Sequence, residues 1–490
     1  MFAAGARVVE EIVAMFKGKM GKAVILAGGG NNGGDGFVIA RRLFDLGWKP
    51  VLCLLVNPEQ LKGDAKIHFD VYMNRGLPVL HGWGQDLSKL RDKLHDADII
   101  VDALLGTGVR GAVREPFKTV ISMVNALQGK KIVLSVDIPS GVESDSGKVE
   151  STAIIATKTI TFVFPKKGFF LQDGPKHVGA WKAVDISVPP SLSSELGLDM
   201  PTVITEQLVK TSIPSRPQQG HKGTFGHALV IGGSRPYVGA PIYTAKAVLH
   251  SGAGLVTLAI PESIYSIVAS QNPESLLWPL PERHGHFSEE AIAEICSRLQ
   301  PFDCIAVGPG MSRFTDGEKW MRTLIENLQN QPIVADADAL YLLRNELDAI
   351  RSYKGAVIFT PHPGEMATLL NKTVKEVEEN RIDVARGFAK EHRVFLLLKG
   401  HRSIMATPAG SVYINPFGHD ALGKGGSGDV LTGLITSFLA QGATPLHAML
   451  SASYFHARAG EEKAKELSRY GVMPLDIIAS VKEQLAVLCY

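Results

Sequence analysis

The sequence predicts two α/β domains, each built on a mostly parallel β-sheet covered by helices. Its 490 residues exceed what one hydrophobic core commonly supports. Short apolar runs alternate with helical segments in both halves, which is the pattern of parallel strands joined by helical crossovers. A proline-rich stretch with little periodicity, from about Val188 to Gly223, separates the halves. We therefore predict domains at residues 1–205 and 206–490.

Two series of apolar runs are expected to form buried strands. In the first half these runs are Ala23–Ala27, Pro50–Val56, Asp98–Leu105, Ile132–Ile138 and Thr159–Phe164. In the second half they are Ala228–Ile231, Leu255–Ile260, Cys304–Val307, Ile333–Ala335, Ala356–Thr360 and Val394–Leu398. Open α/β sheets bind ligands at the carboxyl ends of their strands, so the residues after these runs are the candidates for function.

Composition excludes several classes of partner. Lys and Arg total 51 against 49 Asp and Glu, so no overall field attracts nucleic acid or an anionic membrane. No stretch approaches the roughly 18 apolar residues of a membrane span, and Met1–Met20 reads as an amphipathic helix and not as a signal peptide. The four cysteines form no CxxC pair, which favours reduced thiols and a cytoplasmic protein.

The first glycine-rich segment, Gly28–Gly36, reads GGGNNGGDG and follows an expected strand. We expect it to be a loop that precedes a helix over Phe37–Leu46. Backbone N–H groups of such a loop can surround an anion where the helix dipole also favours negative charge. The segment matches neither the Walker loop nor the dinucleotide pattern GxGxxG.

Two more strand ends supply carboxylates. Asp102 precedes the glycine-containing loop Gly106–Gly111, and Asp137 precedes Ser140. Asn32, Asp102 and Ser140 offer only hard oxygen ligands, which suit K⁺, Na⁺ or Mg²⁺ and not zinc. The residue types alone do not choose among these cations.

The motifs GGGNNGGDGFVIAR, VDALLGTGVRG and VDIPSGVESDSG, in this order, resemble the NAD(P)H-hydrate epimerase family over roughly residues 1–200. The resemblance implies a Rossmann-like three-layer α/β/α domain with K⁺ held by Asn32, Asp102 and Ser140. It also implies that Asp102 is the acid/base residue for interconverting the two configurations at the hydrated C6 of the nicotinamide ring. The residues implied to contact the hydrated cofactor are Asn31, Asn32, Gly33, Gly34, Asp35, Gly106, Thr107, Gly108, Val109, Arg110, Gly111 and Asp137.

Members of that family usually carry a further segment before the helix that begins here with Met1–Gly5. Two interpretations stay open at this stage. The epimerase or its dimer contacts are impaired, or the natural start lies upstream.

The second glycine-rich segment, Gly423–Gly433, reads GKGGSGDVLTG and is expected to open a helix that runs through Leu439. Its N–H groups can hold a transferring phosphoryl group while Asp429 accepts the proton of an attacking hydroxyl. This motif resembles the ribokinase-like fold, which serves kinases of many acceptors, so it indicates phosphoryl chemistry without naming the acceptor.

Further motifs limit the choice of phosphoryl acceptor. They are HKGTFGHALVIGGS at 221–234, GAP at 239–241, VGPG at 307–310, DADAL at 336–340 and TPHPGEM at 360–366. Together they resemble ADP- or ATP-dependent NAD(P)H-hydrate dehydratases over roughly residues 206–490. The resemblance implies that Ala240, Gly310, His362 and Asp429 contact the hydrated cofactor. It implies that Lys399, Gly400, His401, Arg402, Ser403 and Gly428 contact the nucleotide, which brings Mg²⁺. Gly418–Leu422 departs from the family's usual sequence and affects the expected nucleotide fit.

The two resemblances imply a repair enzyme for hydrated nicotinamide cofactors. It would epimerise R- and S-NAD(P)HX and dehydrate the S form to NAD(P)H at the expense of ADP, releasing AMP and phosphate. A homo-oligomer is expected. The alternatives are a vitamin or hydroxymethylpyrimidine kinase with a non-catalytic N-terminal ligand-binding domain, and a first domain that serves as a sensor or interaction scaffold. The sequence does not decide whether the enzyme uses ADP or ATP, or whether it prefers NADHX or NADPHX. It also leaves open the identity of the cation and the number of subunits.

Overall fold

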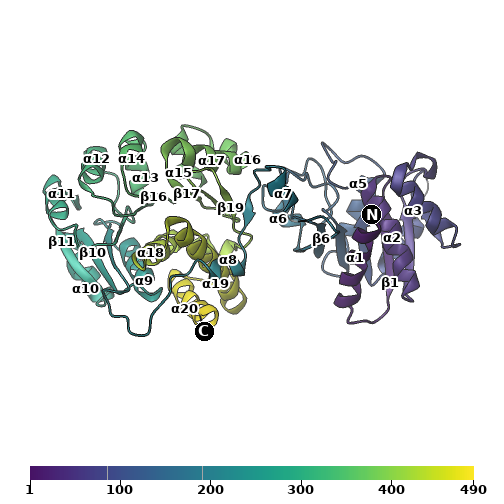
Figure 1. The fold of residues 1–490 in the computed structure, drawn as a ribbon, viewed down its shortest axis with the longest axis horizontal. Helices are drawn as coiled ribbons and strands as arrows, with labels where there is room; N and C mark the ends of the chain where they lie inside the picture. The colour runs from purple at the N-terminus through teal and green to yellow at the C-terminus, as the bar shows by residue number, and fades with distance from the viewer. Residues whose placement is uncertain (85–86, 190, 490) are drawn as a thin grey trace. The chain divides into compact units, whose positions relative to one another are not determined.

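The computed structural model describes residues 1–84, 87–189 and 191–489 and divides the chain into two compact units, Met1–Leu198 and Asp199–Tyr490 (Figure 1). No helix among the described residues is long and apolar enough to cross a membrane. Cys53, Cys296 and Cys304 are free thiols, as expected, and the side chain of Cys489 lies outside the described part.

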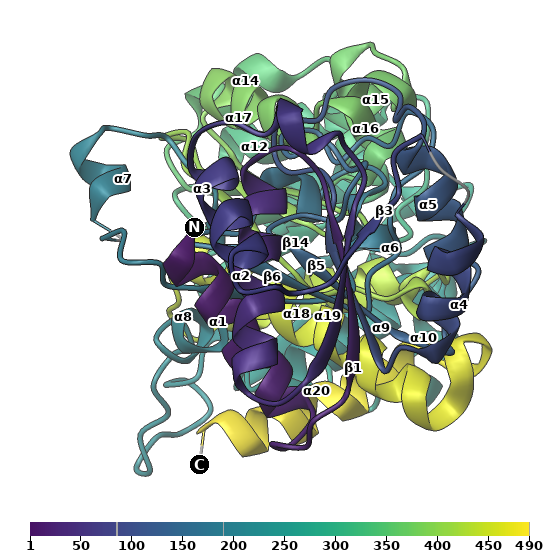
Figure 2. The same cartoon turned by 90° about the vertical axis from the view of Figure 1, so that its right-hand side faces the viewer.

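The first unit is a seven-stranded, wholly parallel sheet with the strand order β3-β2-β1-β4-β5-β6-β7. Its strands are β1 Lys22–Ala27, β2 Lys49–Leu54, β3 Val79–His81, β4 Ile99–Ala103, β5 Ile132–Val136, β6 Lys158–Phe162 and β7 Ala180–Val184. Its helices are α1 Phe2–Met15, α2 Asn31–Asp45, α3 Gly63–Met73, α4 Ser88–Asp96, α5 Phe117–Asn125, α6 Gly174–His177 and α7 Leu192–Glu195. The expected three-layer arrangement is confirmed, because α1, α2 and α3 cover one face of the sheet and α4 and α5 cover the other (Figure 2).

Both faces of this sheet are apolar, since successive side chains of a strand point to opposite faces. Ile25 of β1 packs in the core beneath α1 and α2, whereas its neighbours Val24 and Leu26 pack in the core beneath α4 and α5. Strands that are buried on both faces read as unbroken apolar runs, which is why their positions were predictable.

The glycine-rich segment corrects one expectation. The helix does not begin at Phe37: α2 starts at Asn31, with Gly30 as its N-cap residue. Gly33 and Gly36 therefore lie inside the helix, where a Cβ on Gly33 would come within 2.0 Å of the carbonyl oxygen of Gly28 and one on Gly36 within 2.9 Å of the Ala103 side chain. These glycines are needed for close packing of α2 against the neighbouring backbone and sheet.

The division between the units falls at residue 198, a few residues before the expected position near 205. The strand β8, Thr202–Val203, lies in the expected linker and pairs with β19, Val412–Ile414, in the second unit. Backbone hydrogen bonding therefore assigns this part of the linker to the second unit.

The second unit contains a ten-stranded sheet with the order β11-β10-β9-β14-β15-β16-β17-β18-β19-β8. The strands not yet given are β9 His227–Ile231, β10 Leu255–Pro261, β11 Leu276–Leu280, β14 Cys304–Val307, β15 Ile333–Ala335, β16 Val357–Phe359, β17 Phe395–Leu398 and β18 Ile404–Ala406, and a separate hairpin joins β12 Glu282–Arg283 to β13 His286–Phe287. The strands from β11 to β17 are parallel, and β18 is antiparallel to both of its neighbours.

Helices cover both faces of this second sheet, with α12, α14 and α17 on one side and α9, α18 and α19 on the other (Figure 1). The helices are α8 Glu206–Lys210, α9 Gly239–His250, α10 Tyr265–Gln271, α11 Glu289–Cys296, α12 Gly317–Asn327, α13 Asp338–Leu342, α14 Leu347–Ser352, α15 Pro363–Leu370, α16 Val374–Glu379, α17 Arg381–His392, α18 Ser427–Ala440, α19 Pro445–Gly471 and α20 Pro474–Cys489.

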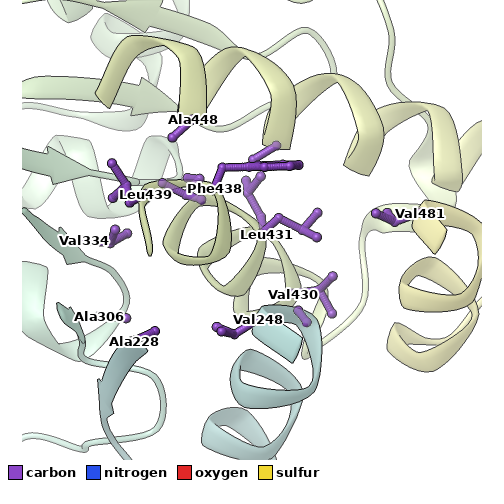
Figure 3. Close-up of a cluster of buried hydrophobic side chains, with 14 of the residues drawn as sticks. Ala228, Val248, Ala306, Val334, Val430, Leu431, Phe438, Leu439, Ala448 and Val481 are labelled. Carbon is purple, nitrogen blue, oxygen red and sulfur yellow. The ribbon is translucent and has the colours of Figure 1, made fainter. Parts of the chain in front are cut away.

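Helix α18 is the centre of the core in the second unit (Figure 3). Leu431 and Phe438 of α18 are buried with Val248 of α9, Ala448 of α19 and Val334 of β15. A helix that is apolar on nearly every side packs in the interior, and this burial fixes the position of the N-terminus of α18, where Asp429 lies.

The approach of α18 to α9 generates a stability prediction. A Cβ on Gly433 would lie 2.4 Å from the carbonyl oxygen of Thr244, so Gly433→Ala should lower the free energy of unfolding by about 1–3 kcal/mol through overpacking. The matched control is Gly387→Ala in α17, where no atom lies within 4 Å of the added Cβ. There alanine should be neutral or stabilising by up to about 1 kcal/mol. Urea unfolding checks both, and equal effects at the two glycines would contradict the packing argument.

Candidate active sites

The site of the first unit is built around Asp102, at the carboxyl end of β4. Its side chain is fully buried, and Oδ2 accepts hydrogen bonds from Ser135 Oγ at 2.7 Å and from the Ser140 N–H at 2.9 Å. Oδ1 accepts from Ser140 Oγ and, at 3.3 Å, from the Leu104 N–H. Burial raises the pKa of Asp102, and the hydrogen bonds from Ser140 and Ser135 oppose that rise.

Oxygen atoms gather beside this carboxylate. Asn32 Nδ2 donates to the carbonyl oxygen of Leu105 at 2.9 Å, and Ser140 Oγ lies 3.2 Å from the same oxygen. This arrangement leaves Asn32 Oδ1 buried without a hydrogen-bond partner in the described part of the chain. Burying an amide oxygen without a hydrogen-bond partner is unfavourable and uncommon, and a bound cation would give this oxygen a partner. The side chains of Asn32, Asp102 and Ser140 therefore fit the expected hard-cation site.

Asp137 and Asp35 are further carboxylates of the first unit. Asp137 follows β5 with a positive φ of 64°, and its Oδ1 pairs with Lys166 Nζ at 2.7 Å and accepts from Thr161 Oγ1 at 3.0 Å. Asp35 lies on α2 and is only 7% exposed, so burial raises its pKa to about 7, opposed by the amino terminus and reinforced by Asp137. Asp35 is thus a carboxyl that can gain or lose a proton near neutral pH.

The loop Gly106–Gly111 lies against the same site. A Cβ on Gly106 would come within 3.3 Å of the Asn32 side chain, which shows how closely the loop approaches α2. The loop is also joined to the segment after β5, because Ser144 Oγ donates to the carbonyl oxygen of Thr107 at 3.2 Å. The structure thus brings the expected loop residues and the expected cation ligands together.

The site of the second unit is centred on Asp429, in the first turn of α18. Burial is the main cause that raises the pKa of Asp429 to about 7, and Asp336 raises it further while Lys399 opposes the rise. The N-cap residue of α18, Gly426, is in the left-handed conformation (φ 93°), and the Ser427 N–H donates to the carbonyl oxygen of Lys424 at 3.2 Å. The N–H groups of Gly428 and Asp429 lie in the first turn, where an α-helix offers no intrahelical acceptor. A proton acceptor and a group of N–H donors are therefore adjacent, as phosphoryl transfer requires.

A buried ion pair lies beneath Asp429. Lys399 Nζ is 2.8 Å from Asp336 Oδ1 and 3.7 Å from Glu365 Oε2, while Thr432 Oγ1 of α18 donates to Asp336 Oδ2 at 2.7 Å. Burial alone would raise the pKa of Asp336, but the Lys399 ammonium holds it below its usual range. Burial would likewise lower the pKa of Lys399, but Asp336 and Glu365 raise it. The pair is therefore charged, and it joins β15 and β17 to α18.

The expected substrate residues of the second unit come from three different loops. A Cβ on Gly310, which has a φ of 65°, would lie 3.0 Å from the Ala240 side chain, so the loops after β9 and β14 touch. His362 caps α15 through Nδ1, which accepts from the Gly364 N–H at 3.0 Å, and burial lowers its pKa. His362 is therefore a neutral imidazole whose Nε2 carries the hydrogen.

Arg381 fixes the backbone of the segment Lys399–Ser403, which is expected to contact nucleotide. Its guanidinium is buried and donates to the carbonyl oxygens of Leu398, Lys399 and Arg402 at 3.1 to 3.2 Å. A Cβ on Gly400 would lie 2.1 Å from this guanidinium, so a larger residue there would displace the Arg381 side chain. Lys399 Nζ lies 3.5 Å from the Cβ position of Gly428, which brings this segment to the start of α18.

His456 of α19 supports the same turn from the other side. Its Nε2 lies 2.9 Å from the carbonyl oxygen of Ser427 and 3.0 Å from the Ser427 hydroxyl, so Nε2 donates to the carbonyl. Burial lowers the pKa of His456 to about 4, which keeps the imidazole neutral. Among the described residues, no three His, Cys, Asp or Glu side chains form a metal cluster.

Sequence reasoning did not assign roles to Asp336, Arg381 or His456. Asp336 stood in the recognised motif DADAL, and its place at the end of an expected strand was a usable signal. Arg381 and His456 lie within helices, and no local pattern indicates that they reach a loop distant in the sequence.

The fold and the site of the second unit define a nucleotide-dependent enzyme with ribokinase-like architecture. Its solved relatives include the ADP/ATP-dependent NAD(P)H-hydrate dehydratase from Bacillus subtilis, crystallised with ATP and Mg²⁺, which is 28% identical with a TM-score of 0.52 and covers 59% of this chain and 99% of its own. A ribokinase-like protein from Enterococcus faecalis is 25% identical with a TM-score of 0.52, over 59% of this chain and 96% of its own.

Sequence comparison covers both units. The family model described as NAD(P)H-hydrate dehydratase matches residues 228–483, and the model described as YjeF-related protein N-terminus matches residues 1–168. The bifunctional NAD(P)H-hydrate repair enzyme of Moorella thermoacetica is 37% identical over 97% of this chain and 90% of its own, and that of Dictyoglomus turgidum is 31% identical over 93% and 87%. The chain belongs to the family of bifunctional NAD(P)H-hydrate repair enzymes.

The buried His456 predicts a loss of stability in acid. In the folded protein it stays neutral down to about pH 4, whereas in the unfolded chain it gains a proton below the ordinary pKa of 6.5. Its contribution is present above pH 6.5 and is lost as the pH falls towards 4, by about 2 kcal/mol at pH 5. Urea unfolding at about pH 7.5 and pH 5 measures how far the free energy of unfolding falls between the two pH values. For His456→Gln this fall should be about 2 kcal/mol smaller than for the unsubstituted protein. Parallel losses in the two proteins would contradict the prediction.

Proposed function

We propose that this chain repairs hydrated nicotinamide cofactors, with an epimerase in the first unit and a nucleotide-dependent dehydratase in the second. The observation that carries the proposal is the placement of the Asp429 carboxyl, with its pKa raised to about 7, beside the first N–H groups of α18. The touching loops of Ala240 and Gly310 lie at the same edge of the sheet, where the reacting ring would bind.

In the dehydratase, Asp429 accepts the proton of the C6 hydroxyl as that oxygen attacks the terminal phosphoryl group of the nucleotide. The N–H group of Gly428 and the Lys399 ammonium stabilise the charge on the phosphoryl oxygens. The C6–O bond then breaks with its electrons leaving on phosphate, assisted by the lone pair of the ring nitrogen, and a proton lost from C5 restores the reduced ring. Hydroxide leaves poorly and phosphate leaves readily, which is the reason to phosphorylate first.

The nucleotide is proposed to lie along Lys399–Ser403 and Gly428, with ADP converted to AMP and phosphate released. Mg²⁺ prefers phosphate oxygens together with one or two carboxylates, so it would arrive with the nucleotide. A relative crystallised with ATP and Mg²⁺ supports the same ligand class.

In the epimerase, the proposed cation is K⁺, held by Asn32, Asp102 and Ser140. When bound, it would supply a fixed positive charge beside the reacting ring. Asp102 remains the acid/base residue that the family resemblance implies, but both of its oxygens already accept hydrogen bonds. Asp35 is a second candidate for proton transfer because its pKa is raised to about 7. Either assignment makes Asp102 necessary, since it also orients Ser140.

The kinase alternative is not favoured, because relatives matched over 97% and 93% of the chain are named as bifunctional repair enzymes. Homo-oligomeric assembly and a cytoplasmic location remain predictions of the sequence.

The direct test uses an epimeric mixture of hydrated NADH with Mg²⁺, K⁺ and either ADP or ATP. Absorbance of the reduced ring should recover fully, with both epimers consumed and no phosphorylated dinucleotide accumulating. Recovery that stops after one epimer would contradict the epimerase, and a stable phosphorylated product would contradict the dehydratase.

The two sites should be separable by mutation. Asp429→Asn should lower dehydration by about 100-fold or more, because it removes the proton acceptor, and should leave epimerisation intact. Asp102→Asn should do the reverse. Chromatography of the two epimers and ring absorbance measure the two activities in the same sample. Loss of both activities from either change, in protein with native circular dichroism, would contradict independent sites.

The cation site has its own test. Replacing K⁺ with tetramethylammonium at constant ionic strength should slow epimerisation, and Asn32→Leu should remove the dependence on K⁺ because it deletes the unpartnered oxygen. Dehydration of the purified S epimer by the same variant serves as the internal control. An Asn32→Leu enzyme that responds to K⁺ as the unsubstituted enzyme does would contradict the assigned ligand.

A further inference from the structure

Strands β5 and β6 of the first unit both end in an uncommon turn. After β5 the turn is centred on Asp137, with a φ of 64°, and the N–H of the next residue donates to the carbonyl oxygen of the residue before it at 2.8 Å. After β6 it is centred on Val163, with a φ of 63° and a corresponding distance of 2.7 Å. Such a hydrogen bond around a residue of positive φ defines the rarer, strained form of γ-turn. Since neither central residue is glycine, surrounding contacts must maintain both turns.

Lys166 joins these two turns. Its Nζ lies 2.7 Å from Asp137 Oδ1 and donates to Thr161 Oγ1 at 3.1 Å and to the carbonyl oxygens of Phe162 and Phe164 at 3.2 and 3.3 Å. The Lys166 side chain is only 20% exposed. An ammonium group has three N–H donors and no acceptor, so these four oxygens occupy all of its capacity. Lys166 is therefore engaged by the protein and has no donor left over for a ligand.

The groups that reach Asp137 converge on one of its two oxygens. Oδ1 lies 2.7 Å from Lys166 Nζ and accepts from Thr161 Oγ1 at 3.0 Å and from the Phe162 N–H at 3.2 Å. No group in the described part of the chain donates a hydrogen bond to Oδ2. Both oxygens of a carboxylate carry lone pairs, so Oδ2 is the atom that remains to accept a hydrogen bond from a ligand.

Asp137 belongs to the same sheet edge as the cation site. Strands β4, β5 and β6 are neighbours in the sheet, and Asp102 of β4 accepts a hydrogen bond at 2.9 Å from Ser140, in the segment that follows Asp137. The charge of Asp137 also acts on Asp35 of α2. A ligand held by Asp137 would therefore lie at the edge that carries the groups proposed for proton transfer.

We propose that Lys166 is a positioning residue of the epimerase: it fixes Asp137 so that Oδ2 accepts a hydrogen bond from a hydroxyl group of the hydrated dinucleotide. The proposal rests on the proposed epimerase function and adds to it a residue that touches neither the substrate nor the cation. The hydrogen bond to Oδ2 is made both before and during the reaction, so it contributes to substrate affinity and not to the turnover of the bound complex.

The test follows conversion of the purified R epimer of hydrated NADH to the S epimer by the full chain without nucleotide, so that dehydration does not contribute. Lys166→Met should raise KM by about tenfold, the effect of losing one hydrogen bond to a charged group, and change kcat by less than about twofold. The matched control is Lys167→Met, which removes the exposed neighbouring lysine and should leave both constants unchanged.

A double-mutant cycle separates positioning from direct contact with the substrate. If Lys166 acts through Asp137, Lys166→Met should raise KM no further in the Asp137→Ala background, where the carboxylate is already absent. Dehydration of the purified S epimer with ADP or ATP measures the activity of the second unit in each variant. Native circular dichroism shows that each variant is folded.

The outcomes separate this proposal from the function on which it rests. A rise in KM that persists in the Asp137→Ala background, a fall in kcat at unchanged KM, or no change in either constant would overturn the role of Lys166 and leave the epimerase in place. If the unsubstituted enzyme does not accelerate interconversion of the epimers, the proposed epimerase fails and the role of Lys166 fails with it. A rise that requires Asp137, and is absent in Lys167→Met, would support the proposal.

Discussion

The ion pair between Lys399 and Asp336 is the interaction on which the site of the second unit depends. The Asp336 side chain is 2% exposed and that of Lys399 is 18% exposed, and taking a single charge out of water costs several kcal/mol unless it is paired and hydrogen-bonded. Here the ammonium lies 2.8 Å from the carboxylate, and Thr432 satisfies the second oxygen. Because Thr432 belongs to α18, the pair ties the helix that carries Asp429 to the centre of the sheet.

This pair also sets the proton affinity of Asp429. Asp336 is an adjacent negative charge that raises the pKa of Asp429, while Lys399 limits the rise. The result lies near 7, where a carboxylate is both a competent base and frequently ionised. A lysine that contacted only nucleotide would leave Asp336 buried and uncompensated. The geometry therefore gives Lys399 a structural partner in addition to its proposed ligand, and phosphate oxygens would extend an existing arrangement of charges.

Much of the fold followed from the sequence because parallel strands buried on both faces are continuous apolar runs, as in β1, β4 and β9. The strands that escaped prediction are β3, β7, β8, β11, β12, β13, β18 and β19. Several are only two or three residues long, and the longer β7 and β11 are partly exposed, so they do not read as apolar runs. The start of α2 was misplaced because Gly and Asn have low intrinsic helix propensity, and only tertiary packing explains glycines inside that helix. In the sites, Asp102 was identifiable from its place at a strand end and Asp429 from the glycine-rich segment that opens α18, whereas the support given by His456 to Ser427, 29 residues away, was not.

The proposed division of labour needs no fixed geometry between the two units. Epimerisation is reversible, whereas dehydration consumes a nucleotide and releases phosphate, so it draws the epimer mixture in one direction by mass action. A dehydratase that accepts one epimer can therefore consume both when the epimerase works in the same solution. Under the proposal, the first unit accordingly needs only a positioned proton donor, Asp102 or Asp35, and the charge of a cation held by Asn32, Asp102 and Ser140. Burying charges costs more free energy in the second unit, where Lys399, Asp336 and Asp429 lie together. The proposed reaction step with the highest energetic demand, departure of the oxygen from C6, takes place in that unit.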